Sequence, residues 1–160
     1  MDQENFSHLD KDGSANMVDI SEKNITSRSA SASCTVFLSS KAFDLVKENQ
    51  IEKGNVLNIA KIAAISASKK TYDLIPLCHQ IPLSKVDVDF SLNEKNKTIQ
   101  IQSRAFTDWK TGVEMEALTA VSIASLTIYD MCKSVDKSIK ITDIQLDKKT
   151  GGKSGIYIRK

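Results

Sequence analysis

The chain has 160 residues, of which 41% are apolar and 26% charged, a balance that is typical of a globular domain and excludes a disordered or fibrous protein. Its 22 basic and 20 acidic residues leave a formal net charge of +2, so charge alone gives no general affinity for a polyanion. Three widely spaced cysteines do not form the pattern of a disulfide framework, and the polar N-terminus lacks a secretory or transit signal. We therefore expect a cytoplasmic protein.

The first expected elements are an arm, a strand and a short helix. Residues 1–16 are mostly polar, which predicts a disordered arm ahead of a single domain over residues 17–160. Residues 34–38 are β-prone. Either Ser39 or Ser40 can then cap a short helix.

A second helix, a loop and a hairpin come next. Apolar residues recur at helical spacing after Asn55, which can cap a helix that ends near Lys70. The segment 73–84 contains both prolines of the chain and is expected to be a loop. Apolar and polar residues alternate on both sides of the polar stretch 93–97, which predicts a β-hairpin.

The last elements are a charge-free helix and two strands. Residues 117–129 carry no charge, but the run is shorter than the roughly 20 residues needed to span a bilayer. We expect a buried helix that is apolar almost all round, so that a subunit interface is needed to cover it. Strands over 139–146 and 156–158, with a turn between them, complete the order β-α-α-β-β-α-β-β. This order predicts an α+β fold with a mainly antiparallel sheet and helices packed on one face.

A local basic loop lies near the C-terminus, where Lys148, Lys149 and Lys153 surround two glycines. It is not a Walker loop, because Asp147 stands where that motif has its first glycine and no helix follows. The loop is either a close-approach site for an anion or a solvated tail.

Cys78 and His79 lie between the two prolines, but no further ligands at fixed spacing accompany them, so a zinc site is not expected. A histidine in such a rigid loop suits proton transfer or a hydrogen bond to a base, although an ordinary surface histidine is the alternative.

Asp130 and Lys133 are three residues apart and share a helix face, as either a proton-transfer pair or a surface ion pair. Because they follow the charge-free run, we expect partial desolvation that lowers the lysine pKa. Glu114 and Glu116 are two apart, so only an extended start of this segment would place them on one side. Their alternative role is to stabilise the helix N-terminus.

Several sequence blocks, taken together and in order, resemble those of the MoaC family, the cyclic pyranopterin monophosphate synthases of molybdenum cofactor biosynthesis. The four most specific blocks are MVDIS (17–21), PLCH (76–79), TGVEMEALT (111–119) and YDMCK (129–133). Two shorter ones, KGNV (53–56) and GGKSG (151–155), occur at the matching places.

The resemblance implies a ferredoxin-like subunit that assembles as a homohexamer, a trimer of dimers, with active sites at the dimer interface. It implies a phosphorus-oxygen lyase that converts (8S)-3′,8-cyclo-7,8-dihydroguanosine 5′-triphosphate to cyclic pyranopterin monophosphate and pyrophosphate, one step after a radical cyclase. No cofactor is required for these steps, although Mg²⁺ can accompany the triphosphate. Nucleic acid and membranes are not expected partners.

The resemblance also implies the site residues. Its catalytic positions correspond to Asp130 and Lys133, with Lys53 and Lys149 close to the reacting groups. The matching substrate-binding positions are Leu77, Cys78, His79, Glu114, Met115, Glu116, Arg28, Lys23 and Lys153, with Asp19 as a weaker candidate.

The alternative from another functional class is a ferredoxin-like module that binds a nucleotide or RNA without catalysis. RNA-recognition sheets stack bases on strand aromatics, whereas the predicted hairpin offers only Phe90 and Phe106. A purely structural oligomer would leave the lysines, the histidine and Asp130 without a role.

Overall fold

The centre of the fold is a long strand, β1 (Thr26–Phe37), which pairs antiparallel with β3 (Thr98–Trp109) on one side and β4 (Lys140–Thr150) on the other. Strand β2 (Lys85–Asn93) pairs with the outer edge of β3, and β5 (Tyr157–Ile158) pairs with the end of β4. The sheet order is β2-β3-β1-β4-β5 in the computed structural model. The first four strands have the ferredoxin-like arrangement, in which two βαβ units interleave.

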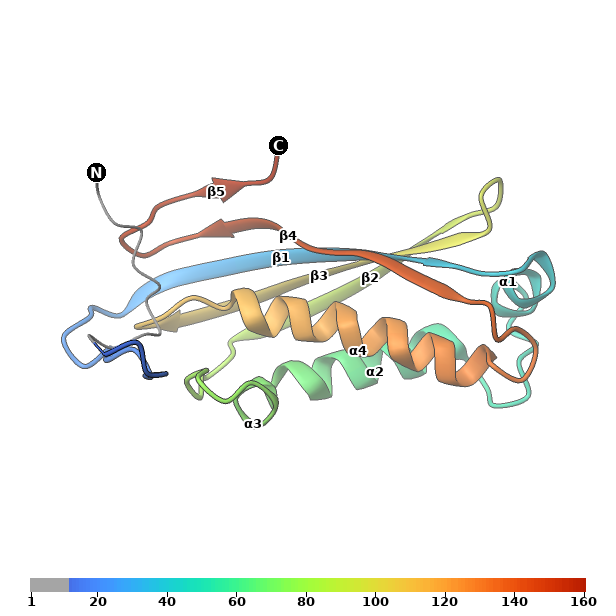
Figure 1. Ribbon diagram of the computed structural model, residues 1–160. Helices are drawn as coiled ribbons and strands as arrows, with labels where there is room; N and C mark the ends of the chain where they lie inside the picture. The colour runs from blue at the N-terminus through green and yellow to red at the C-terminus, as the bar shows by residue number, and fades with distance from the viewer. Residues whose placement is uncertain (1–11) are drawn as a thin grey trace.

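The helices lie on one face of this sheet (Figure 1). Helix α4 (Glu114–Cys132) packs against β1, β3 and α2 (Val56–Ser68), and α2 also contacts β2. The short helix α1 (Ser40–Lys47) lies at one end of the sheet. The predicted α+β class with helices on one face is therefore confirmed.

The structure describes residues 12–160. Most of the predicted arm, residues 1–16, lies outside the described residues, so its disorder stays a prediction. No helix in the described part of the chain is long and apolar enough to cross a membrane.

Side-chain caps fix where α1 and α2 begin. Ser39 accepts a hydrogen bond from the Ala42 amide at the start of α1, and Asn55 accepts one from the Asn58 amide at the start of α2, 2.9 Å away. Each cap satisfies a donor that the helix itself leaves free. Both capping predictions are confirmed, and α2 ends at Ser68, close to the predicted end.

Small residues allow the helix layer to approach the sheet closely. The inward side of β1 is lined by Ala30, Ala32 and Cys34, which are buried, and α4 presents Ala117 and Ala124 to the same core. Alanines also line the buried side of α2 where it meets α4. Close packing of backbones at these positions leaves no room for larger side chains.

The structure corrects two sequence expectations. The segment 73–84 is not entirely a loop, because the one-turn helix α3 (Thr71–Leu74) enters it. Helix α4 begins at Glu114, earlier than the charge-free run, so the extended start considered for Glu114 and Glu116 is not present. Glutamates in the first turn of a helix are favoured by its dipole, which explains the early start.

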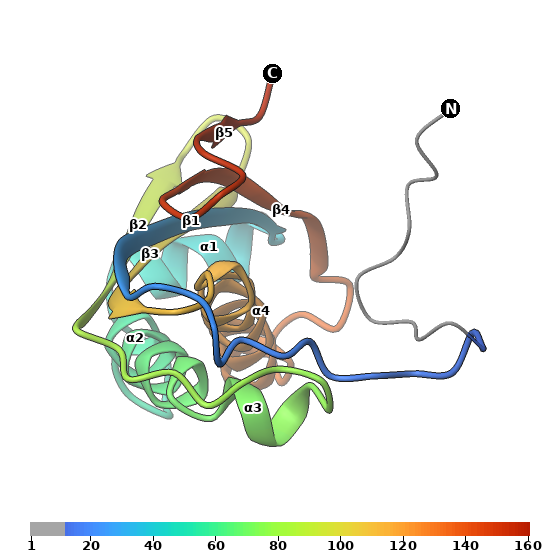
Figure 2. The same cartoon turned by 90° about the vertical axis from the view of Figure 1, so that its left-hand side faces the viewer.

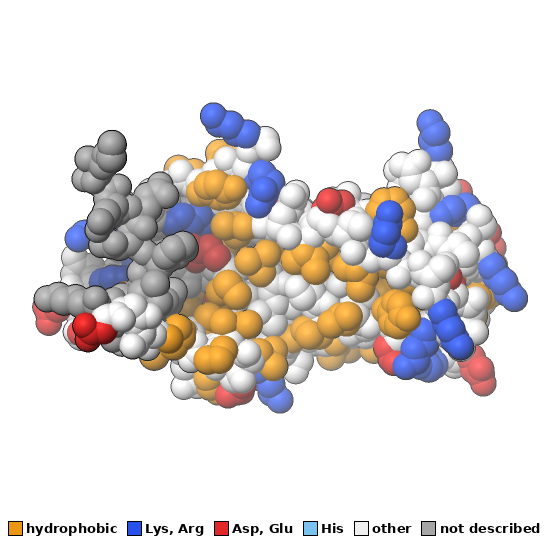
Figure 3. Space-filling view, in the orientation of Figure 1, with side chains coloured by type: hydrophobic (Ala, Val, Ile, Leu, Met, Phe, Trp, Pro, Cys, Tyr) orange, Lys and Arg blue, Asp and Glu red, His pale blue; other side chains and the backbone are white. Residues whose placement is uncertain are grey.

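Apolar side chains remain uncovered on the face where α4 and β4 lie. Figure 3 shows them along the middle of this face, with lysine and arginine side chains gathered at its right-hand end. Leu126 of α4 is 55% exposed and Ile144 of β4 is 47% exposed. Uncovered apolar groups of this kind mark interaction surfaces more often than scattered single residues do.

Candidate active site

Helix α4 carries predicted site residues at both of its ends. Glu114 is its first residue and Asp130 lies in its last turn. The two are sixteen positions apart, and at a rise of about 1.5 Å per residue this amounts to about 24 Å along the helix axis. We call the groups around them the N-terminal cluster (around Glu114) and the C-terminal cluster (around Asp130).

The N-terminal cluster surrounds a cavity of about 690 Å³. It is bounded by the segment before β1, the start of β1, the turn before α4 and the loop after β4. The predicted site residues that line it are Asp19, Lys23, Arg28, Glu114, Lys149 and Lys153. Four of these six are cations, and with Glu22 the whole lining carries four cations against three carboxylates, so the cavity has a small local excess of positive charge.

Lys149, at the end of β4, contacts both the start of α4 and the loop after β4. Its Nζ lies 3.6 Å from Glu114 Oε1, and it also donates a hydrogen bond to the hydroxyl of Ser154. The side chains of Lys149 and Glu114 are 21% and 30% exposed. This partial burial makes the pair less screened by solvent than an ordinary surface pair.

Arg28 lies on β1, the strand that pairs with the end of β4, and a hydrogen bond fixes its side chain. Its Nε donates to the backbone carbonyl of Trp109 at 2.9 Å, which leaves the outer nitrogens of the guanidinium directed to the cavity side where Gly152 lies. A methyl group on Gly152 would stand 3.1 Å from Arg28 Cζ, so only glycine leaves this space free. The predicted glycine turn therefore has a role beside the cavity.

The segment before β1 is also held by specific contacts, and it crosses the end of the molecule at which α4 begins (Figure 2). Asp19 Oδ1 accepts from the Ser21 amide at 2.8 Å, and Lys110 Nζ donates to the Ser21 carbonyl at 2.6 Å. The hydrogen bonds from Ser21 lower the pKa of Asp19, with weaker contributions from the charges of Lys110 and His79. His79 is therefore close to this segment.

Glu116 carries a buried carboxyl group close to Cys78. It is 3% exposed, and no donor among residues 12–160 reaches its Oε2. Burial raises the pKa of Glu116 to about 7, and the charge of Glu114 adds to this rise. The pKa of Cys78 is raised by its own burial and then by Glu116, which places the two groups near each other. A buried acceptor without a donor is a natural contact for a ligand.

Three further predicted residues lie close to this end of the molecule. Leu77 and His79 flank Cys78 and are partly buried, as is Met115 in the first turn of α4. None of them lines the cavity itself. They lie beside the N-terminal cluster but are not part of the cavity wall.

The C-terminal cluster consists of Asp130, Lys133 and Lys53. Lys133 Nζ lies 2.6 Å from Asp130 Oδ1, and Lys53, from the segment between α1 and α2, donates to the Asp130 carbonyl at 3.0 Å and lies 3.4 Å from Oδ2. The side chains are 47–59% exposed.

The pKa shifts in this cluster contradict one expectation. The hydrogen bond with Asp130 raises the pKa of Lys133, and the same bond lowers the pKa of Asp130. The desolvation that was expected to lower the lysine pKa is small, because both side chains face solvent in the single chain. In this state both groups are charged at neutral pH.

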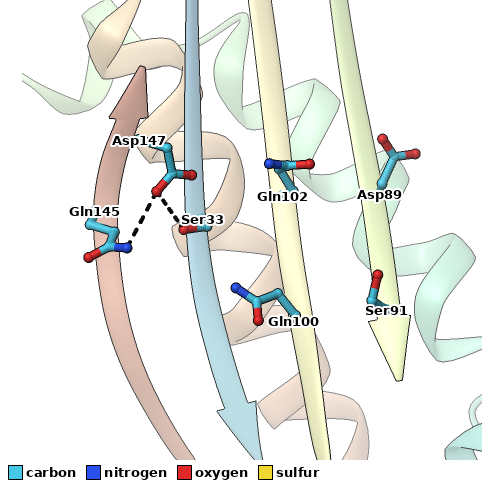
Figure 4. A pocket seen from close by; sticks show the side chains of 7 residues that line it. All are labelled: Ser33, Asp89, Ser91, Gln100, Gln102, Gln145 and Asp147. Carbon is cyan, nitrogen blue, oxygen red and sulfur yellow. Dashed lines mark hydrogen bonds between the residues drawn. The ribbon is translucent and has the colours of Figure 1, made fainter. Parts of the chain in front are cut away.

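A second hollow, of about 490 Å³, lies on the outer face of the sheet and is unrelated to these clusters. Figure 4 shows that its lining side chains are two aspartates, two serines and three glutamines, with Asp147 accepting a hydrogen bond from Ser33. Its lining contains no cation, and the carboxylate of Asp147 would repel an anionic ligand. We therefore place the candidate site at the ends of α4.

Sequence reasoning missed several groups that shape the cavity. Lys110 and Ser21 anchor its N-terminal wall, and Gly112 forms the turn before α4. Nothing in the spacing of these residues indicated a role, because their contacts depend on chain segments that meet only in the fold. Across residues 12–160, no group of three or more His, Cys, Asp or Glu side chains could hold a metal ion.

Comparisons with known proteins point in one direction. The model of the MoaC family matches residues 17–152. A protein named cyclic pyranopterin monophosphate synthase from Heliobacterium modesticaldum is 54% identical over 96% of this chain and 97% of its own length. One of the same name from Natranaerobius thermophilus is 51% identical over 94% of each chain. An Arabidopsis thaliana protein, named as the mitochondrial form of this synthase, is 51% identical over 99% of this chain and 58% of its own length.

Proposed function

The chain belongs to the MoaC family, and from this membership we infer that it catalyses the synthesis of cyclic pyranopterin monophosphate in molybdenum cofactor biosynthesis. The substrate that we propose is (8S)-3′,8-cyclo-7,8-dihydroguanosine 5′-triphosphate, and the second product is pyrophosphate. The chain is an enzyme of the lyase class. The alternative of a nucleotide-binding or RNA-binding module without catalysis is not favoured, since the curated relatives are named as a synthase.

The observation that carries the choice of substrate is the basic cavity at the start of α4. A triphosphate brings several negative charges, and Lys23, Arg28, Lys149 and Lys153 converge on one cavity in a chain of net charge +2. The first turn of α4 adds the positive end of a helix dipole. We propose that these groups bind the phosphates and stabilise the pyrophosphate as it leaves.

The C-terminal cluster supplies the acid-base chemistry in this proposal. Opening the imidazole part of the purine, closing a new ring and forming a cyclic phosphate are proton-transfer and addition steps. We propose that Asp130 and Lys133 move these protons, with Lys53 close to the reacting groups. No protein-bound cofactor is needed for such steps, and Mg²⁺ would arrive with the triphosphate.

A complete site then requires two subunits. Groups that take part in one proton transfer must lie within roughly 3 Å of the atoms they serve, whereas the two clusters are about 24 Å apart along α4. Pairing two copies of α4 in opposite directions would bring the C-terminal cluster of one copy to the N-terminal cluster of the other. The exposed Leu126 and Ile144 supply an apolar surface for such pairing. We propose dimers of this kind, assembled into a homohexamer.

The buried Glu116, with Cys78 and His79 beside it, suits the heterocycle of the substrate better than its phosphates. An unpaired carboxyl oxygen accepts hydrogen bonds from ring N–H and amino groups, and it would repel a phosphate. Leu77 and Met115 would border this part of the site.

We further propose a cytoplasmic location and a functional link to the radical cyclase that makes the substrate. All three cysteines are free thiols in the described part of the chain, which suits a reducing compartment.

Incubation of the purified protein with the cyclised guanosine triphosphate tests the proposed reaction. Pyrophosphate and the pterin product should appear in equal amounts, the first measured by a coupled assay and the second by chromatography. If a folded, oligomeric protein releases neither product, the proposed reaction is wrong. Binding of single-stranded RNA by such a protein would favour the binding-module alternative.

A further inference from the structure

Gly112 precedes α4 at a position where the backbone does not need a glycine. The chain has five glycines with positive φ, and Gly112 is not one of them. A residue with a Cβ could therefore adopt the same backbone conformation without strain. The reason for glycine here must lie in what surrounds it.

The space in front of Gly112 is occupied by the carboxyl group of Glu114. A methyl group at Gly112 would stand 2.7 Å from Glu114 Cδ and 2.8 Å from Oε1, closer than carbon and oxygen atoms approach without a bond. The nearest atoms all belong to the far end of this one flexible side chain. A substitution would move the carboxyl group and leave the backbone in place.

The position of this carboxyl group matters because it lies against Lys149 on the wall of the basic cavity. Glu114 Oε1 is 3.6 Å from Lys149 Nζ, and Gly112, Glu114 and Lys149 all line the cavity. Because Gly112 and Glu114 both line the cavity, a carboxyl group displaced from Gly112 would have this cavity beside it to move into. A negative charge would then occupy the volume in which an anion binds.

We propose that Gly112 is a positioning residue that keeps the Glu114 carboxylate against Lys149 and out of the anion site. The absence of a side chain at Gly112 sets the affinity of the cavity for phosphate groups. This inference rests on the proposed function for the identity of the anion, and on the contacts of Glu114 for its geometry.

The test compares four proteins: the unsubstituted chain, Gly112→Ala, Glu114→Ala and the double variant. Pyrophosphate affinity is measured by calorimetry, KM and kcat with the cyclised guanosine triphosphate, and folding by thermal unfolding. Gly112→Ala should unfold at the same temperature as the unsubstituted chain, and its pyrophosphate Kd and its KM should both rise about tenfold. Its kcat should change by less than about threefold, because the displaced charge acts on binding.

The Glu114→Ala background separates the inference from a general effect of the alanine. Glu114→Ala has no carboxylate for the added methyl group to displace. The Kd and KM of the double variant should therefore differ by less than about twofold from those of Glu114→Ala. The inference would be overturned if Gly112→Ala left the affinity unchanged, or if it lowered the affinity equally with and without Glu114. It would also be overturned if Gly112→Ala prevented folding both with and without Glu114. An unsubstituted chain that binds no pyrophosphate would overturn it as well.

The proposed reaction and the proposed role of Gly112 can fail separately. If the unsubstituted chain turns over its substrate and Gly112→Ala has normal KM, the reaction stands and the role of Gly112 is wrong. If the unsubstituted chain has no turnover but pyrophosphate affinity follows the expected pattern, the reaction is wrong and Gly112 keeps its role.

Discussion

Glu114 and Asp130 lie at opposite ends of α4, and each is paired with a lysine from another part of the chain. Glu114 meets Lys149 of β4 at 3.6 Å, and Asp130 accepts a hydrogen bond at its backbone carbonyl from Lys53 at 3.0 Å. One helix thus fixes two groups of charged residues about 24 Å apart. In the proposed enzyme, one group binds phosphate and the other moves protons.

Removing either partner of the Asp130–Lys133 pair should abolish most turnover without unfolding the protein. Both side chains are about half exposed, so Asp130→Ala or Lys133→Ala leaves no buried charge without a partner. General acid-base groups contribute typically about 10²- to 10⁴-fold to rate, and kcat should fall by an amount in this range. Steady-state kinetics and size-exclusion chromatography would measure activity and assembly.

The Lys47–Glu94 ion pair provides a matched control for these variants. Its side chains are 47% and 66% exposed, close to the exposure of the Lys53–Asp130 pair. Lys47→Ala should retain normal kcat. Near-normal turnover by Asp130→Ala, or an equal loss in Lys47→Ala, would remove the C-terminal cluster from the mechanism.

Lys149→Ala should weaken substrate binding. Loss of a hydrogen bond to a charged group costs about 2 kcal/mol, which corresponds to a rise in KM of about 30-fold. Lys148→Ala is the control, since successive side chains of a strand point to opposite faces and Lys148 does not line the cavity. Equal KM values for the two variants would contradict the assignment of Lys149 to the phosphate site.

Glu116 should make stability depend on pH. Burial raises its pKa from 4.5 to about 7, so between these values the folded chain binds more protons than the unfolded chain, and stability falls as pH rises. Glu116→Gln removes this cost. Relative to the unsubstituted chain, the variant should gain on the order of 3 kcal/mol between pH 4.5 and pH 8.

Denaturant unfolding of both proteins at several pH values would measure that gain. A stability difference that does not change over this range would show that Glu116 is ionised in the folded chain. The activity of Glu116→Gln at one pH cannot replace this comparison, because the group also borders the proposed substrate site.

Asp136 links the end of α4 to the start of α1. It accepts hydrogen bonds from the Ser39 amide at 2.7 Å and from the amide and hydroxyl of Ser138 at 2.8 and 2.6 Å. These bonds, with the Ser138 hydroxyl as the largest cause, lower the pKa of Asp136 to about 2. Asp136→Asn should therefore lose about 2 kcal/mol of stability at pH 7.

The lowered pKa gives this loss a pH dependence. The stabilisation by Asp136 is present above its ordinary pKa of 3.8 and is lost as pH falls through about 2, so the two proteins should converge in acid. Thermal unfolding at pH 7 and pH 3 would measure the difference, with Asp108→Asn, at an exposed carboxylate of β3, as the control. A difference that is the same at both pH values would contradict the role of ionised Asp136.

The sequence predicted the order of the long elements because their signals are local. Ser39 and Asn55 cap their helices through amides three residues away, and the hairpin follows from alternation on both sides of a polar turn. Strand β1 extends eight residues beyond the predicted start, at Thr26, because its serines and alanines have little β-propensity of their own. Its pairing with β3 on one edge and β4 on the other stabilises it as a strand.

The separation of Glu114 from Asp130 follows from their spacing along one helix, but the partners that join them in each cluster could not be predicted from the sequence. The family resemblance supplied the residues, and the spacing of Asp130 and Lys133 predicted that they would meet. No spacing rule places Lys149 beside Glu114 or Lys110 beside Ser21, since these contacts join segments 35 and 89 residues apart. The raised pKa of Lys133 was missed because local hydrophobicity suggested a burial that the single chain does not provide.

Mixed oligomers test most directly whether one active site is formed from both clusters across a subunit interface. Asp130→Ala and Lys149→Ala subunits with different tags are co-expressed, and activity is measured at a substrate concentration at which neither variant alone turns over. Random pairing makes half of the dimers mixed, with one intact site of two, so about a quarter of the unsubstituted activity should return. A mixture that is no more active than its parents would contradict a site shared between subunits.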